Sequence, residues 1–454
     1  MYATTNPATG ELVQTFESLS DEQARAVLDA ADRAYSAWSV ADLGERADVV
    51  WRIGALHRER AAELAALMTQ EMGKPLAQGT AEVELAASIY DYYADKGPAL
   101  LKDELLDIAG KGQAVVRTAP IGPLLGIMPW NFPLYQVARF VAPNLLLGNT
   151  VLLKHAQNCP RLALAIEAIV ADAGAPRGVF TNVFVTHTQI AEMIASRQLQ
   201  GVSITGSERA GRIIGALAGG HLKKCVLELG GSDPLIVLPD ADIEQAVVAA
   251  ANGRFWNAGQ ACTSSKRTIV TADVWDSFVN RFIDEASGWK AGDPTDVQTR
   301  LGPLATVQSR ADVAEVVEDA VAKGATLHLG GQIPPGDGAY YPATVLSGVT
   351  PAMRAYHEEI FGPVAVLYKV ASVDDAVRVA NDSPFGLGSA VFGADASAAE
   401  AVGDRLNVGM VGVNMLVRSS PEMPFGGVKN SGIGRELGRF GLDEFANKKL
   451  IRRA

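Results

Sequence analysis

The stretch LLGIMPWNFPLYQVARFVAPNLLLGNTVLLK, residues 124–154, decides the fold class of this chain. A short apolar strand at 124–128 leads into the proline-bounded turn PWNFP at 129–133. A helix is expected near 134–147, and the strand TVLLK follows at 150–154. Strands and helices continue to alternate as far as residue 229. This alternation predicts an α/β fold in which helices cover a parallel sheet and ligands bind at the carboxyl ends of the strands.

The regions on either side of this unit are also expected to be folded. Upstream, Ser20 begins a helix, with a glutamine three residues later that completes a capping box. Two further helices are expected over 42–72 and 76–96. Downstream, a second α/β region runs from about 231 to 430. The polar tail after residue 440 is either a terminal strand or a solvated end.

The composition is that of an ordinary globular protein. The chain has 454 residues, of which 48% are apolar and 20% charged, and these values exclude disorder and collagen-like repeats. The 40 Lys and Arg residues against 51 Asp and Glu give a net charge of −11. An acidic surface argues against a nucleic-acid backbone as partner. It does not exclude a small anionic substrate, which needs only a local basic group.

Targeting, membrane and metal signals are not found. The N-terminus lacks a basic region followed by an apolar core. The long uncharged run between Arg117 and Arg139 contains four prolines, which makes a membrane-spanning helix unexpected. Three cysteines without a C-x-x-C pattern favour a reducing compartment, and six histidines without metal-ligand spacing predict no metal site. We therefore expect a cytoplasmic protein that binds neither membrane nor nucleic acid.

Several polar residues stand where chemistry is plausible, and each has an ordinary structural alternative. Cys262, in NAGQACTSSKR, is either an accessible nucleophile or a buried, inert cysteine. Glu228, at the end of the strand in LELGGSDP, is either a general base or a surface glutamate. Asn131 in the PWNFP turn either donates its amide to an oxyanion or makes an Asx turn. Ser207 in TGSERAG is either a phosphate ligand or a helix N-cap, and Lys154 either binds a ribose or lies in water.

Seven motifs, which occur in one order along the chain, bear on these alternatives. They are PWNFP, TVLLK, TGS, LELGG, GQAC, EEIFGPV (358–364) and PFGGVKNSGIGREL (424–437). With this order, and with Glu228 and Cys262 34 residues apart, the chain resembles the aldehyde dehydrogenase superfamily over most of its length. Seven ordered matches are far more specific than any one of them, so the resemblance favours Cys262 as a nucleophile.

The resemblance implies a particular domain organisation. A Rossmann-type cofactor domain would comprise residues 1–101 and 121–230, and an α/β catalytic domain would comprise 231–430. A small β oligomerisation extension would be formed by 102–120 and 431–454. The family pattern further implies a homodimer or homotetramer.

The resemblance also implies a mechanism and its residues. The Cys262 thiolate attacks an aldehyde, and the amide of Asn131 with the backbone N–H of Cys262 holds the oxyanion. Hydride passes to a nicotinamide, and Glu228 then activates the water that hydrolyses the thioester. The implied cofactor residues are Lys154 and Glu359 at the two riboses, Trp130, Gly206 and Ser207 along the cofactor, and Phe361 near the nicotinamide.

The choice of cofactor depends on position 157. Many NAD-preferring members carry a glutamate three residues after the lysine, where it repels a 2′-phosphate. This chain has Gln157 there, so a like-charge penalty against NADP is absent. The KPS form common among NADP users is also absent, since Ala156 stands at the serine position. We expect NADP as the preferred cofactor, with NAD possible.

Within the superfamily the chain most resembles the succinate-semialdehyde dehydrogenases. Arg139, eight residues after Asn131, matches an arginine that binds the substrate carboxylate in that group, and Ser420 matches a serine contact. Arg418 and Ser419 are adjacent candidates. Some members have a second arginine where this chain has Trp256, so Arg418 or Arg254 would have to replace it.

Other readings of the substrate stay open at this point. The aldehyde is expected to be succinate semialdehyde, and the alternatives are glutarate semialdehyde or a general aliphatic or aromatic aldehyde. A non-catalytic family member would be expected to lack Cys262, Glu228 or Asn131, and all three are present.

Overall fold

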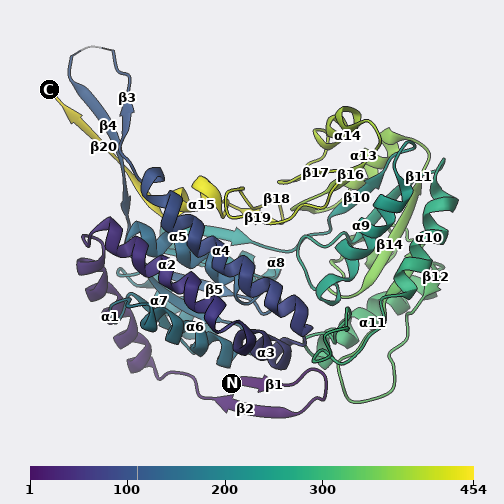
Figure 1. The fold of residues 1–454 in the computed structure, drawn as a ribbon, viewed down its shortest axis with the longest axis horizontal. Coiled ribbons are helices and arrows are strands. Elements are labelled where there is room, and N and C mark those ends of the chain that lie inside the picture. The colour runs from purple at the N-terminus through teal and green to yellow at the C-terminus, as the bar shows by residue number, and fades with distance from the viewer. Residues whose placement is uncertain (110) are drawn as a thin grey trace.

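The computed structural model describes residues 1–109 and 111–454, so residue 110 of the expected extension 102–120 lies outside the described residues. Two α/β bodies lie side by side, and a narrow β arm projects away from one of them (Figure 1). The expected α/β fold class is confirmed. None of the helices in these ranges is long and apolar enough to cross a membrane.

The first body is built on a six-stranded sheet whose strand order is β19-β9-β8-β5-β6-β7. The five strands from β5 to β9 are parallel, as the alternating sequence predicts. The sixth is antiparallel to β9 and comes from far along the chain. The strands are β5 (Pro123–Met128), β6 (Thr150–His155), β7 (Phe180–Asn182), β8 (Gly201–Thr205), β9 (Lys224–Glu228) and β19 (Gly432–Ile433).

Helix α5 (Tyr135–Leu147) connects β5 to β6 and is buried along its whole length. Its surroundings explain this, because it packs between the sheet and the outer helices α2 and α4. Both termini of α5 therefore have fixed positions, and its N-terminal end presents the PWNFP turn at the carboxyl edge of the sheet. The helices of this body are α1 (Asp21–Trp38), α2 (Leu43–Glu59), α3 (Ala61–Met72), α4 (Leu76–Leu100), α6 (Pro160–Asp172), α7 (His187–Ala195) and α8 (Glu208–Gly220).

The second body contains a seven-stranded sheet with the order β12-β13-β14-β11-β10-β16-β17. All its neighbouring strands are parallel except β12 against β13. The strands are β10 (Pro234–Val237), β11 (Arg267–Thr271), β12 (Thr326–Leu329), β13 (Thr344–Ser347), β14 (Val364–Val370), β16 (Ala390–Phe392) and β17 (Gly412–Val413). The helices are α9 (Ile243–Phe255), α10 (Trp275–Ser287), α11 (Val307–Ala322), α12 (Arg354–His357), α13 (Val373–Asn381) and α14 (Ala396–Gly403).

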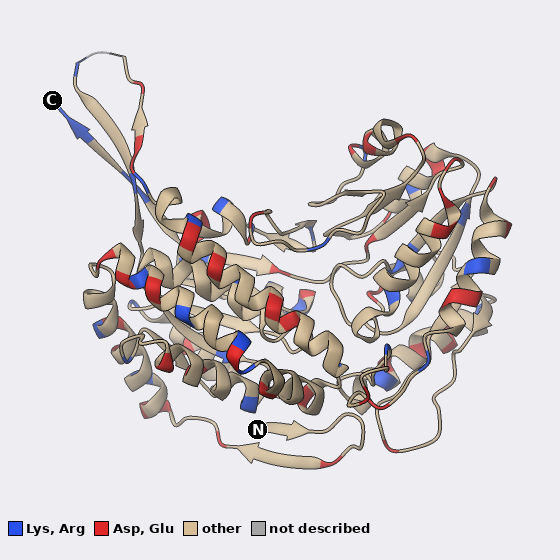
Figure 2. Ribbon diagram, in the orientation of Figure 1, with Lys and Arg blue, Asp and Glu red and all other residues tan. Residues whose placement is uncertain are grey.

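The projecting arm is a three-stranded antiparallel sheet in the order β20-β4-β3. It joins β3 (Glu104–Leu106) and β4 (Gln113–Pro120) to the C-terminal strand β20 (Ala446–Arg453), so the polar tail is a strand. Figure 2 shows the basic residues of β20 along the arm, and charges of both signs interspersed on the outer helices. A short pair, β15 (Phe385–Gly386) with β18 (Val428–Lys429), and helix α15 (Gly438–Glu444) complete the fold.

Three local features differ from the sequence expectations. The helix expected over 42–72 is two helices, because the chain breaks at Arg60 between α2 and α3. Residues 432–433, expected in the extension, pair with β9 in the six-stranded sheet. An unexpected N-terminal hairpin, β1 (Tyr2–Thr5) with β2 (Leu12–Phe16), contacts both bodies through hydrogen bonds from Ala3 N to Gln157 O and from Ala339 N to Pro7 O. The capping box at Ser20 is confirmed.

Candidate active site

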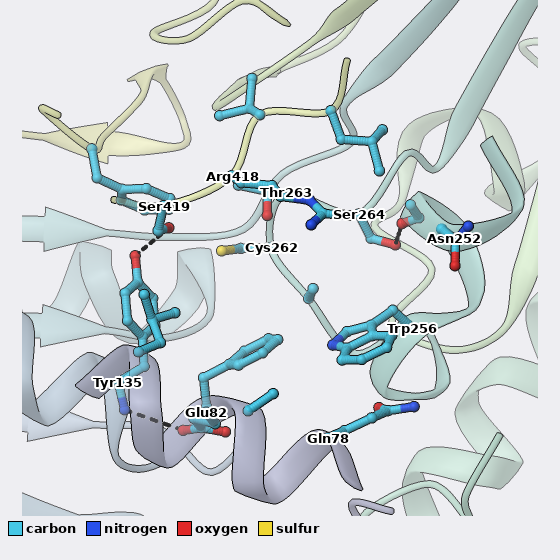
Figure 3. Close-up of a pocket in the computed structure, with 18 of the residues that line it drawn as sticks. Gln78, Glu82, Tyr135, Asn252, Trp256, Cys262, Thr263, Ser264, Arg418 and Ser419 are labelled. Atoms are coloured by element: carbon cyan, nitrogen blue, oxygen red, sulfur yellow. Dashed lines mark hydrogen bonds between the residues drawn. The ribbon is translucent and has the colours of Figure 1, made fainter. Parts of the chain in front are cut away.

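A cavity of about 410 Å³ lies between the two bodies and contains Cys262 in its wall (Figure 3). Its lining comes from α4, the PWNFP turn and start of α5, the end of α9, the loop 261–264, and the segment 416–419 with Phe425. Four of the sequence-predicted residues line it, namely Cys262, Trp256, Arg418 and Ser419. Asn131, Glu228, Arg139 and Ser420 are not part of this lining.

The loop that carries Cys262 is held in an unusual backbone conformation. Just before it, Asn257 and Ala258 have φ values of 53° and 54°, which side chains other than glycine rarely adopt. Gly259 follows at φ 71°, and a Cβ there would lie 2.3 Å from the carbonyl oxygen of Gly362. The chain thus reverses sharply after α9 and directs the Cys262 sulfur into the cavity (Figure 3). Such strain persists only where the surroundings enforce it.

Two buried cations fix the loop from behind. The Lys266 ammonium donates to the carbonyl oxygens of Ala261 at 2.8 Å and Cys262 at 2.9 Å, and pairs with Glu359 at 3.1 Å. The Arg254 guanidinium donates to the Ser264 hydroxyl at 2.8 Å and to the Ile360 carbonyl at 2.9 Å. Both cations therefore join the loop 261–264 to the segment 359–362. Arg254 is fully buried and does not line the cavity, so it is not placed to bind a substrate carboxylate there.

Burial dominates the electrostatics of the two central titratable groups. It raises the pKa of the Cys262 thiol to about 12, while the positive charges of Arg139 and Lys266 lower it. Burial likewise raises the pKa of the Glu228 carboxyl well above its ordinary value, against the lowering effect of Arg139. The Glu228 charge is also among the causes that raise the pKa of the thiol. Both groups are thus strong bases once deprotonated.

Glu228 ends β9 as expected and is 2% exposed. Its Oε1 has no hydrogen-bond partner among the described residues. Space for this oxygen depends on Gly426, because a Cβ there would lie 2.8 Å from Oε1. A buried carboxyl without a donor costs stability. Because its charge also affects the pKa of the Cys262 thiol, this carboxyl is a candidate for the chemistry rather than for holding the fold.

Asn131 lies just behind the cavity wall, with its polar atoms engaged. Its side-chain amide donates to Gln260 O at 3.0 Å, and its Oδ1 accepts from Gln136 at 3.1 Å. Its backbone carbonyl accepts from Lys74 at 2.8 Å and from Asn257 at 2.9 Å. A side-chain NH₂ has two hydrogens, so one remains for another acceptor.

Arg139 has a different environment from the one expected for a carboxylate ligand. Its Nε lies 2.7 Å from Oε2 of Glu436, and the side chain is 1% exposed. The guanidinium lies over the rings of Tyr135 and Phe425, at 4.8 and 4.4 Å from their centroids. Its Nη1 donates to the Tyr135 hydroxyl at 3.3 Å, and that hydroxyl donates to Ser419 at 2.5 Å. The ion pair and the Tyr135 ring therefore separate Arg139 from the cavity.

A second cavity, of about 550 Å³, lies over the N-terminal end of α8 and near Glu359. It is lined by Ser207, Glu208, Arg209, Arg212, Ile213, Glu359 and Phe385. Ser207 is the N-cap of α8 and accepts from Ala210 N at 3.3 Å, so its ordinary structural role is present. The exposed N–H groups at a helix start also attract phosphate.

Lys154 at the end of β6 is the other feature that fits a dinucleotide. It is 9% exposed, and no carboxylate pairs with it among the described residues. Burial lowers the pKa of its ammonium to about 8. The nearest aromatic ring is that of Tyr2, with the ammonium 5.6 Å from its centroid. A buried cation without a counterion is suited to an anionic or polyhydroxyl ligand.

The remaining predicted cofactor residues are spread around these two features. Gln157 is exposed, Gly206 donates its N–H to the Glu228 carbonyl at 2.9 Å, and Glu359 accepts from Gly231 N at 3.0 Å. The rings of Trp130 and Phe361 meet edge to face at 5.7 Å.

Sequence reasoning missed several residues of the site. Lys266 is only four residues from Cys262, but nothing in the sequence shows that its ammonium is buried. Tyr135 follows the PWNFP turn and was read as part of the helix. Lys74 and Glu82 approach Asn131 only through the fold.

Comparisons with known proteins agree with this geometry. The model of the "Aldehyde dehydrogenase family" matches residues 1–451. The chain belongs to the aldehyde dehydrogenase family. A Deinococcus radiodurans relative named succinate-semialdehyde dehydrogenase (NADP+) is 52% identical over 451 residues, covering 99% of this chain and 94% of that protein. An Escherichia coli K12 relative named succinate semialdehyde dehydrogenase (NAD(P)+) Sad is 44% identical and covers 98% and 96%.

Solved aldehyde dehydrogenase structures show the same fold. The succinic semialdehyde dehydrogenase of Streptococcus pyogenes, in complex with NADP+ as the cofactor, is 41% identical and superposes with a TM-score of 0.97, covering 99% of each chain. In this aldehyde dehydrogenase the sheet edge, the second cavity and Lys154 thus lie in a fold that accommodates a nicotinamide dinucleotide in a relative.

Proposed function

We propose that this aldehyde dehydrogenase oxidises succinate semialdehyde to succinate with NADP+ as its preferred cofactor. The observation that carries the proposal is the cavity that holds both Cys262 and Arg418. Arg418 is exposed and makes no ion pair among the described residues. A carboxylate and an aldehyde at opposite ends of one short substrate would satisfy both residues. The relatives named for this substrate support the same choice over glutarate semialdehyde or a general aldehyde.

The carboxylate contact is assigned to Arg418 and the hydroxyls of Ser419 and Tyr135. Figure 3 shows the Ser419 and Tyr135 hydroxyls joined by a hydrogen bond on the side of the cavity toward which the Cys262 sulfur points. Arg139 stands behind Tyr135 and adds a positive potential without leaving Glu436. Ser420, outside the lining, has no assigned contact. Charge-assisted hydrogen bonds of this kind give an ω-carboxy aldehyde its advantage over a neutral one.

The chain's own residues carry the chemistry in three steps. The Cys262 thiolate forms a C–S bond with the aldehyde carbon, and the resulting oxyanion accepts hydrogen bonds from the Asn131 amide and the Cys262 N–H. When bound, the oxidised nicotinamide would supply the hydride acceptor, and loss of the hydride from the thiohemiacetal carbon would leave a thioester on Cys262. Glu228 then removes a proton from water, the water oxygen attacks the thioester carbon, and the C–S bond breaks to release the acid.

The cofactor would be held by residues at the carboxyl edge of the six-stranded sheet. Lys154 would contact the adenosine ribose and its 2′-phosphate, Gly206 and Ser207 would lie beside the diphosphate, and Glu359 would contact the second ribose. Trp130 and Phe361 would flank the nicotinamide. The unpaired Lys154 and the uncharged side chain at position 157 support NADP over NAD.

Assembly and compartment complete the proposal. Among the described residues, no strand pairs with the outer edges of β3 and β20, and the arm exposes Leu105 and Leu450. Apolar residues on open strand edges favour pairing with another chain, so we assign the arm to a homodimer or homotetramer contact. The domain limits proposed above are 1–101 with 121–230, 231–430, and 102–120 with 431–454. Within the last range, residues 446–453 lie in the arm and residues 432–433 in the six-stranded sheet. Three free cysteines fit the reducing cytoplasm.

The test is a comparison of kcat/KM for succinate semialdehyde, glutarate semialdehyde and butanal, each with NADP+ and NAD+. Succinate semialdehyde with NADP+ should give the highest value. Cys262→Ala should bind NADP+ with unchanged affinity but give no turnover. Equal values for butanal and succinate semialdehyde would refute the substrate assignment, and turnover by Cys262→Ala would refute the mechanism.

A further inference from the structure

The side-chain amide of Asn131 is useful for catalysis only if its orientation is fixed. Its hydrogen bonds to Gln260 and Gln136 set the amide plane, and both partners are themselves buried. The backbone of the same residue is fixed separately through its carbonyl oxygen. A preorganised oxyanion donor needs both kinds of restraint, because the side chain follows its Cα.

One of the two donors on this carbonyl is a buried lysine. Lys74 lies in the short connection between α3 and α4 and is 1% exposed. Its ammonium donates to Asn131 O at 2.8 Å and lies 4.0 Å from the centroid of the Phe132 ring. Its counterion is Glu82 on α4, which is also buried. The ammonium thus contacts two consecutive residues of the PWNFP turn, Asn131 and Phe132.

The partner carboxylate holds the other end of the same turn. Glu82 Oε1 accepts from Leu134 N at 2.9 Å and from Tyr135 N at 3.1 Å, which are free N–H groups at the start of α5. Figure 3 shows Glu82 on α4 with its hydrogen bond to Tyr135. Lys74 and Glu82 therefore span the turn from Asn131 to Tyr135, and both lie more than 45 residues earlier in the chain.

We propose that the Lys74–Glu82 pair positions the Asn131 amide for the oxyanion and so sets the rate of the chemical steps. The inference rests on the proposed function of Asn131. Neither residue touches the reacting atoms, since Lys74 does not line the cavity and the carboxylate of Glu82 is occupied by the turn and by Lys74. A buried ion pair adds little stability over apolar residues of the same size, so stability alone does not account for charges at this position.

The expected effect is on kcat rather than on binding. Loss of the ammonium leaves Asn131 O with Asn257 as its remaining donor and frees the turn to shift. A displacement of about 1 Å in a catalytic group lowers the rate by about 100-fold. We therefore expect kcat to fall about 10- to 100-fold in Lys74→Met, with KM for the aldehyde and the dissociation constant of NADP+ changed less than about threefold.

The decisive experiment is a double-mutant cycle with Asn131→Ala. If Lys74 acts through Asn131, Lys74→Met should cost less than about twofold in kcat in the Asn131→Ala background. Equal losses in both backgrounds would overturn the proposal. Rates are normalised to the Cys262 thiols titrated per chain, so that a lower folded fraction does not count as a slower active site.

Two further variants keep the test decisive. Lys74→Met leaves Glu82 as a buried unpaired charge, so the cycle is repeated with Lys74→Met/Glu82→Gln, which removes both charges together. Lys224→Met is the matched control, because Lys224 also donates to two backbone carbonyls, those of Glu444 and Ala446, at the far end of β9 from Glu228. It should leave kcat unchanged.

The outcomes separate this inference from the proposed function. If wild type oxidises another aldehyde better than succinate semialdehyde, the substrate assignment fails, and the cycle is measured with that aldehyde. If Asn131→Ala leaves kcat unchanged, the oxyanion role of Asn131 fails and the inference fails with it. Additive losses with a normal Asn131 effect overturn the inference alone.

Discussion

The substitution Gln157→Glu should convert the cofactor preference of this enzyme from NADP+ toward NAD+. The backbone at this position is fixed, because the Gln157 carbonyl accepts from Ala3 N at 2.9 Å. The side chain itself is exposed, so a carboxylate fits without repacking. The new charge would stand three residues from Lys154, the cation to which we assign the 2′-phosphate.

The size of the effect follows from Coulomb's law in a water-like medium. A carboxylate about 5 Å from one unit of negative charge costs about 0.8 kcal/mol, and a phosphate carrying about two units doubles this to about 1.7 kcal/mol. We therefore expect kcat/KM for NADP+ to fall about 20-fold. The value for NAD+, which has no charge at that place, should change less than about twofold.

The assay is initial-rate kinetics with each cofactor at a saturating aldehyde concentration, at two ionic strengths. Gln157→Ala is the control, since it removes the amide without adding charge and should change the ratio of the two kcat/KM values less than threefold. The effect of Gln157→Glu should shrink as salt is added, because exposed charges are screened. An unchanged cofactor ratio, or the same change in Gln157→Ala, would show that the 2′-phosphate does not lie beside residue 157.

Four other measurements test different parts of the site. Arg418→Met should lower kcat/KM for succinate semialdehyde about 5- to 30-fold, which corresponds to about 1–2 kcal/mol for a partly exposed charge contact. It should leave kcat/KM for butanal unchanged. The control is Arg405→Met, since Arg405 is an exposed arginine paired with Asp374. Glu228→Gln should give a burst of one NADPH per active site and then slow turnover, because hydrolysis of the thioester lacks its base; a linear time course at the wild-type rate would contradict this. The preference of wild type for NADP+ over NAD+ should fall as the pH rises through about 8. The reason is that burial lowers the pKa of Lys154 to about 8, so its charge is lost above that value. A preference that does not change between about pH 7 and 9.5 would exclude Lys154 as the cation that distinguishes the two cofactors. Burial raises the pKa of Asp233 to about 7. Between about pH 4 and pH 7 the Asp233 carboxyl is therefore protonated in the folded state and ionised in the unfolded state. Stability therefore falls as the pH rises from about 4 to 7, by at most about 4 kcal/mol, and thermal melts of Asp233→Asn should lack this part of the pH dependence.

Local patterns were sufficient to predict much of the fold. The alternation of strands and helices from 124 to 229 can be recognised from residues close together in the sequence. The parallel strands β5 to β9 confirm the sheet that this alternation predicts. The Ser20 capping box was predicted for the same reason, since all its groups lie within four residues. The β1–β2 hairpin escaped prediction because β2 is exposed on both faces and shows no apolar alternation.

Contacts between distant residues explain what the sequence did not reveal about the site. The order of the motifs predicts Cys262 and Glu228 as site residues. In the structure Cys262 lines a cavity and Glu228 is buried. Arg139 has the spacing of a substrate ligand, but its partner Glu436 is 297 residues away. Whether an arginine points to a cavity or to another side chain depends on such partners, and no local pattern contains that information.

The cations Lys266 and Arg254 restrain one part of the cavity wall, and another described part of the wall is free of their bonds. Because they join the loop 261–264 to the segment 359–362, a substitution of either cation would disturb the loop of Cys262 and the segment of Glu359 together. Among the described residues, neither cation bonds to the segment 416–419, which also lines the cavity. A descendant of this protein could therefore acquire a new substrate through a few surface changes in that wall, while the inherited reaction stayed intact.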